Sequence, residues 1–82
     1  MADVAATLLS IWRDVLGADV SATDSFFDLG GDSFVALRVL ARIKDELGYD
    51  VSIADLLDYP TVAELTAVVQ HAYPEPARQS AP

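Results

Sequence analysis

The sequence predicts an all-α fold, a small bundle of three longer helices and one short helix. Two observations predict it: apolar residues recur at helical spacing in separate segments, and no run alternates apolar and polar residues over a useful strand length. The 82 residues are enough for one domain, and 52% of them are apolar, so a packed core can form although the chain has no cysteine for disulfides.

The first helix is predicted to begin near Val4 and to stop at Gly17. Its apolar residues at helical spacing are Val4, Leu8, Ile11, Trp12 and Val15. Residues 18–32 follow as a connection rich in Asp, Ser, Thr and Gly, which is long for so small a domain. Such loops are functional or are fixed by their own side chains. We expect the side chains of Phe26 and Phe27 to fix this one.

The second helix is predicted over residues 33–47, with Gly48 as its stop and Lys44 near the negative end of its dipole. At about 100° per residue, one stripe of this helix is apolar and is assigned to the core. Its members are Ala36, Val39, Leu40, Ile43 and Leu47.

Two capping boxes predict the remaining helices. Ser52 with Asp55 opens a short third helix, and Thr61 with Glu64 opens a fourth one after the break at Pro60. The apolar side of the fourth helix consists of Val62, Leu65, Val68 and Val69. We expect one domain over residues 1–73 and a disordered tail over residues 74–82, which have nothing to bury.

Charge restricts the classes of partner. Thirteen acidic and five basic residues give a net charge of −8, which argues against nucleic acid and anionic membranes and favours basic patches on proteins. Acidity that merely keeps the domain soluble is the simpler interpretation. The N-terminus lacks a basic region of the signal-peptide type and no apolar run reaches membrane-span length, so we expect a soluble, cytoplasmic protein.

Most catalytic and metal sites are excluded by the residues present. The single histidine, His71, lies near the tail, and without cysteine there is no catalytic thiol and no zinc cluster. Asp24, Asp28 and Asp32 recur every four residues, but a calcium loop from Asp24 would place Phe26 and Val35 at ligand positions. We therefore expect turn and cap roles for these aspartates.

The run Gly30-Gly31-Asp32-Ser33 resembles a phosphate-binding turn before a helix, but it has no lysine and lacks the spacing of a nucleotide-binding loop. Two glycines permit unusual backbone angles, and Ser33 would stand at a helix N-terminus, where unpaired N–H groups favour a phosphate. Two interpretations remain open: Ser33 as a modification site, or an ordinary helix cap, which the residues alone favour.

A second stripe of the second helix is also apolar. Phe34, Leu37 and Ala41 share a side near Ser33, flanked by Arg38. This stripe is either an exposed docking surface, as apolar patches often are, or it is buried under the loop or the third helix.

Two motifs resemble the thiolation domains (peptidyl carrier proteins) of nonribosomal peptide synthetases, within the acyl carrier superfamily. They are Phe26-Phe27-Asp28-Leu29-Gly30-Gly31-Asp32-Ser33 and Tyr59-Pro60-Thr61-Val62-Ala63-Glu64-Leu65. The resemblance covers about residues 4–72. It implies that Ser33, in a turn with Gly31 and Asp32, receives 4'-phosphopantetheine from coenzyme A, and that the thiol then carries aminoacyl or acyl groups as thioesters. It also implies that the domain is not an enzyme.

The resemblance further implies the partners. They are a phosphopantetheinyl transferase, an adenylation or other acyl-loading enzyme, and condensation, tailoring or thioesterase enzymes, which would contact Phe34, Leu37 and Arg38 on a monomeric carrier. The paired glycines favour the peptidyl subtype, whereas the net charge of −8 leaves a polyketide-type carrier open. The alternative from another functional class is a helical protein-interaction domain in which Ser33 is an unmodified cap. Met1 and the short tail fit a free-standing carrier and an excised domain equally.

Overall fold

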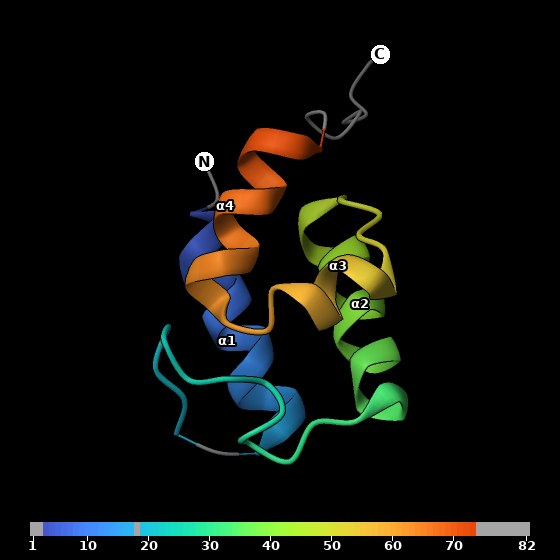
Figure 1. Cartoon of the computed structure of the whole chain (residues 1–82). Coiled ribbons are helices and arrows are strands. Elements are labelled where there is room, and N and C mark those ends of the chain that lie inside the picture. The colour runs from blue at the N-terminus through green and yellow to red at the C-terminus, as the bar shows by residue number, and fades with distance from the viewer. Residues whose placement is uncertain (1–2, 18, 74–82) are drawn as a thin grey trace.

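The computed structural model describes residues 3–17 and 19–73, and these residues form four helices and no strand. The helices are α1 (Val4–Leu16), α2 (Ser33–Leu47), α3 (Ile53–Asp58) and α4 (Val62–Ala72) (Figure 1). The predicted all-α fold of three longer helices and one short one is thus confirmed. The predicted tail, 74–82, lies outside the described residues. No helix of the described part has the length and apolar character to cross a membrane.

The arrangement follows from which helices pack together. Helix α1 packs against both α2 and α4, and the short α3 contacts α2 and α4. In Figure 1 the loop that precedes α2 passes beneath the lower end of α1, and α2 begins at this same end of the bundle. The start of α2 is therefore held at one end of the molecule, away from the end of α4.

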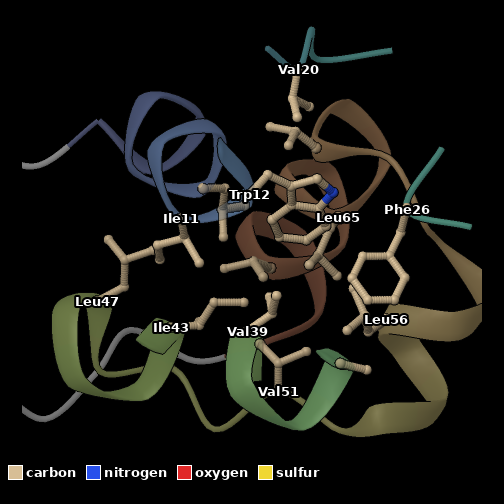
Figure 2. Close-up of a cluster of buried hydrophobic side chains, with 14 residues drawn as sticks. Ile11, Trp12, Val20, Phe26, Val39, Ile43, Leu47, Val51, Leu56 and Leu65 are labelled. Carbon is tan, nitrogen blue, oxygen red and sulfur yellow. The ribbon is translucent and has the colours of Figure 1, made fainter. Parts of the chain in front are cut away.

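The core is built around two aromatic rings (Figure 2). The rings of Trp12 and Phe26 meet edge to face with centroids 6.0 Å apart, and both side chains are fully buried. The α2 stripe assigned to the core is buried as predicted except for Leu40, which is half-buried and packs against the cluster. The buried apolar residues are Leu8, Ile11, Trp12, Val20, Phe26, Ala36, Val39, Ile43, Leu47, Val51, Leu56, Val62, Leu65 and Val69.

Both predicted capping boxes lie at helix starts and make the forward bond of the motif, but in the described structure neither carboxylate accepts directly from the backbone N–H of its cap residue. Thr61 Oγ1 accepts from the Glu64 N–H at 3.0 Å and donates to the Glu64 carboxylate at 3.1 Å. Ser52 Oγ accepts from the Asp55 N–H, whereas the return bond runs through the hydroxyl of Tyr73. That hydroxyl accepts from the Ser52 N–H at 2.9 Å and donates to Asp55 Oδ2 at 2.7 Å, so the end of α4 is tied to the start of α3.

Backbone hydrogen bonds hold the long loop before α2 against the bundle. The Phe26 N–H donates to the Pro60 carbonyl at 2.7 Å, and the Ala63 N–H donates to the Ala22 carbonyl at 3.0 Å. Arg13 Nε donates to the Val20 carbonyl at 3.1 Å. The two phenylalanines expected to fix the loop differ in burial. Phe26 faces Trp12 and is fully buried, whereas Phe27 is 48% exposed and its ring meets that of Phe26 edge to face, with centroids 5.8 Å apart.

The Ser33 turn as candidate functional site

Asp32, not Ser33, caps the second helix. Asp32 has extended backbone angles, and its Oδ1 accepts from the Val35 N–H at 2.9 Å, which satisfies one of the free donors of the first turn. Ser33 is the first residue of α2, it is exposed, and its hydroxyl makes no hydrogen bond to the residues that the structure describes. The interpretation of Ser33 as a cap is therefore wrong, and its hydroxyl is available for chemistry.

The two glycines serve different purposes in the turn. Gly30 has a φ of +89°, a left-handed angle that favours glycine. Gly31 has no such angle, but a Cβ at this position would overlap the ring of Phe26. Its N–H also donates to the Phe26 carbonyl at 3.0 Å. The turn is thus packed directly on a core side chain, which fixes the place where Ser33 begins α2.

The electrostatics of the turn suit a phosphate ester. The first N–H groups of a helix have no intrahelical acceptor and carry the positive end of the dipole. Asp32 uses the donor of Val35, so the N–H groups of Ser33 and Phe34 stay unpaired within the helix. A phosphodiester on Ser33 Oγ would meet these donors and is not hindered by bulk at Gly31. The residues present therefore fit a covalent phosphopantetheine at this serine, with Gly31 acting through packing and Asp32 through the cap.

The second apolar stripe of α2 is exposed. Phe34 is 74% and Leu37 is 56% exposed, and Ala41 and Arg38 also face solvent. Of the two interpretations left open by the sequence, burial under the loop or α3 is therefore wrong for these residues. An exposed apolar surface begins at the residue after Ser33 and continues one turn along the helix.

Two further exposed side chains were missed by the sequence analysis. Tyr59 is 41% exposed at the end of α3, and Phe27 is half exposed in the loop. The hydrogen bond from the Phe26 N–H to the Pro60 carbonyl brings their two segments together. Nothing in the sequence around Tyr59 signals its exposure, whereas the adjacent pair Phe26-Phe27 could have suggested that one of the two rings faces outwards.

One aspartate of the predicted fourfold repeat takes part in a turn. Asp24 accepts from the Ser21 N–H at 2.9 Å and so closes a turn, as expected for an aspartate of this loop. Within residues 3–17 and 19–73, no group of three His, Cys, Asp or Glu side chains is close enough to hold a metal ion. His71 is exposed in the last turn of α4, at the end of the bundle away from Ser33 (Figure 1).

Comparison with known proteins points to one family. The model of the phosphopantetheine attachment site family matches residues 6–69. A nonribosomal peptide synthetase of Curvularia clavata, kk1B, is 47% identical over 68 residues, which are 83% of this chain and 0%, to the nearest percent, of that protein. The chain therefore spans only a very small part of the synthetases that it resembles.

Solved structures give the same result. A nonribosomal peptidyl carrier domain superposes with a TM-score of 0.78 at 31% identity, covering 94% of this chain and 95% of that one. A peptidyl carrier protein in complex with the phosphopantetheine transferase Sfp and coenzyme A has a TM-score of 0.78 at 30% identity, covering 85% and 92% of the two chains. With the family model matching most of the described helices, the chain belongs to the phosphopantetheine attachment site family, as a peptidyl carrier (thiolation) domain of the nonribosomal peptide synthetase type.

Proposed function

We propose that Ser33 is the residue of this carrier domain that bears 4'-phosphopantetheine, and that the arm presents aminoacyl or acyl thioesters to successive partner enzymes. One observation carries the assignment: Ser33 is an exposed hydroxyl at the first position of α2, with the cap supplied by its neighbour Asp32. When bound, the group supplies a thiol on a long arm, and the chain supplies the fixed point from which that arm swings.

The modification reaction needs a nucleophilic oxygen that a transferase can reach. Ser33 Oγ would form a phosphodiester by displacing adenosine 3',5'-bisphosphate from coenzyme A, and the hydroxyl proton would pass to a base on the transferase. The described part of the chain offers no histidine near Ser33, since His71 lies at the far end of α4. We therefore propose that the domain does no catalysis of its own and that both modification and loading are done by separate enzymes.

The surface beside Ser33 is proposed to be the contact for those enzymes. Phe34 and Leu37 are large apolar side chains in water, a state that soluble proteins keep mainly where a partner covers it. Arg38 adds one positive charge on a strongly acidic chain, so it would orient a partner's carboxylate. The proposed partners are the phosphopantetheinyl transferase, an adenylation or other loading enzyme, and condensation, tailoring or thioesterase enzymes.

The boundaries and the place of action belong to the same proposal. The carrier domain is proposed to comprise residues 1–73, which the family match over residues 6–69 supports. The domain acts as a monomer in the cytoplasm, where coenzyme A and the loading enzymes would reach it.

The test is the intact mass of the protein after incubation with coenzyme A and Sfp. The wild type is expected to gain one phosphopantetheine, and Ser33→Ala none. Ser10→Ala, at an exposed serine of α1, is the matched control and should be modified like the wild type. Equal modification of Ser33→Ala would move the site to another residue, and no modification of a folded wild type would overturn the proposal.

A further inference from the structure

A shallow depression lies between α1 and α2, beside the proposed contact surface. Its volume is about 260 Å³, and it is lined by Val15, Arg38, Ala41, Arg42 and Asp45. Val15 comes from α1 and the other four residues from α2. We call it the α1–α2 groove.

One wall of the α1–α2 groove is fixed by ion pairs. Arg42 contacts the carboxylate of Glu46 one turn on, and it reaches across to Asp14 Oδ2 on α1 at 3.2 Å. The hydrogen bonds to Glu46 and Asp14 raise the pKa of Arg42, so the guanidinium stays charged and held. The small side chain of Ala41 and the half-buried Val15 leave room beside this wall.

The other charges of the groove have no partner in the described part of the chain. Arg38 and Asp45 are exposed, and neither forms an ion pair with residues 3–17 or 19–73. Seven residues separate them, which on an α-helix is two turns along one ridge, or about 10 Å. The ridge therefore presents a positive charge near the Ser33 end and a negative charge two turns away, with Ala41 between them.

We propose that the α1–α2 groove receives an α-helix of a partner protein that places a carboxylate opposite Arg38 and a basic side chain opposite Asp45. Complementary charges at a spacing of seven match one face of a helix, and a small residue such as Ala41 lets two helices approach to the usual 8–10 Å. Arg38 borders both the groove and the exposed pair Phe34 and Leu37, so one partner can cover both surfaces. The choice of a partner protein as the occupant rests on the proposed function of Ser33, whereas the shape and charges of the groove do not.

Nucleic acid and anionic membrane are poorer occupants, because the chain carries a net charge of −8 and the groove holds Asp45 beside its arginines. A second copy of this chain is the closest competitor, since an antiparallel α2 would set Arg38 of one copy against Asp45 of the other. A partner helix is favoured because the surface is continuous with the side of Ser33, which must be free to reach enzymes.

The test uses three synthetic helical peptides with the same Ala/Leu face and differing only at two positions seven residues apart: Glu and Lys, Glu and Glu, or Lys and Lys. They are titrated into the isotopically labelled, unmodified protein and followed by amide chemical shifts. We expect the Glu/Lys peptide to bind best, by about threefold per charge pair, and to move the signals of Val15, Ala41 and Asp45.

Variants make the result specific to the groove. Arg38→Glu should shift the preference to the Lys/Lys peptide, and Asp45→Lys should shift it to the Glu/Glu peptide. Lys44→Glu changes the net charge as Arg38→Glu does but lies outside the groove lining, so it should keep the wild-type order. Ala41→Trp should fill the groove and abolish binding of all three peptides.

Three results would overturn the proposal. The Lys/Lys peptide could bind best to every variant, in which case net charge alone decides. The signals of the groove residues could stay unmoved while others shift. The third is a concentration-dependent dimer, detected by light scattering without peptide and disrupted by Ala41→Trp, which would assign the groove to a second copy. Because the unmodified protein is used, none of these outcomes depends on the mass test of Ser33.

Discussion

The two sides of Ser33 are built in opposite ways. The segment before it, residues 19–32, is bound by hydrogen bonds to three other parts of the chain and buries Val20 and Phe26 completely. The segment after it, the outer face of α2, leaves Phe34 and Leu37 mostly in water. The difference separates two features: the side before the serine fixes its position, and the side after it is the exposed surface that we propose as the contact for partner enzymes.

The largest expected effect comes from removing the ring that supports the turn. Phe26→Ala should lower the free energy of unfolding by about 3–5 kcal/mol, because a fully buried ring is lost from the core beside Trp12. Its neighbour provides the control, since Phe27→Ala at a half-exposed ring should cost less than about 1 kcal/mol. Urea unfolding followed by circular dichroism measures both. Equal losses would mean that the loop is not held by Phe26.

If Phe26→Ala leaves too little folded protein, Phe26→Leu keeps the comparison measurable. The leucine retains part of the apolar volume, and its loss of stability should be smaller than that of Phe26→Ala yet larger than that of Phe27→Leu.

The next effect separates the two glycines. Gly31→Ala should cost about 1–3 kcal/mol, because its Cβ would overlap the Phe26 ring, whereas Gly30→Ala should cost about 1–2 kcal/mol through its positive φ. The causes can be told apart by combining each change with Phe26→Leu in a double-mutant cycle. A smaller side chain at residue 26 should reduce the stability lost through Gly31→Ala and leave the stability lost through Gly30→Ala unchanged. The same coupling energy for both glycines would contradict this distinction.

At the boundary between the two segments, the helix cap Asp32 and the proposed modification site Ser33 are adjacent residues. Asp32→Ala should lower stability by about 1 kcal/mol through loss of the bond to the Val35 N–H. Ser33→Ala should leave stability within about 0.5 kcal/mol, since its hydroxyl makes no bond within the described chain. Thermal unfolding of the two unmodified variants measures both losses of stability. A larger loss for Ser33→Ala than for Asp32→Ala would mean that Ser33 is the cap.

The smallest effect on stability is expected on the outer face of α2. Phe34→Ala and Leu37→Ala should each change the free energy of unfolding by less than about 0.5 kcal/mol, because both side chains are exposed. Both should nevertheless slow phosphopantetheine transfer by Sfp at low carrier concentration, with kcat/KM falling roughly fivefold or more if they are central contacts. Lys44→Ala on the same helix is the control. Unchanged kinetics would remove this face from the transferase contact.

Much of the fold could be predicted because its signals are local. Helical spacing of apolar residues marked the core stripe of α2, and the stop residue Gly48 marked its end, where the structure places it. The Thr61 hydroxyl accepts from the Glu64 N–H, as the spacing of this capping pair predicts. Such features depend on residues three or four positions apart, so a sequence contains all that is needed to recognise them.

The sequence predictions differ from the structure where contacts between segments far apart in the chain determine burial and hydrogen bonding. Phe26 and Phe27 are chemically identical neighbours, and the ring that is buried is the one that packs on Trp12 of α1 and the rest of the core. The box between Ser52 and Asp55 is bridged by Tyr73, eighteen residues beyond Asp55, which no local pattern indicates. The exposure of Tyr59 likewise follows from how α3 packs, so its place near the loop could not be read from its neighbours in the chain.

The helices, the core stripe of α2 and the serine at its start could be recognised from the residues alone, because helix propensity, capping and periodicity act over a few residues. Only the packed structure shows that Gly31 is required by the Phe26 ring and that the second stripe of α2 stays in water. The physical reason is that burial and steric contact are properties of pairs of segments, which are fixed only once α1, the loop and α2 have packed together.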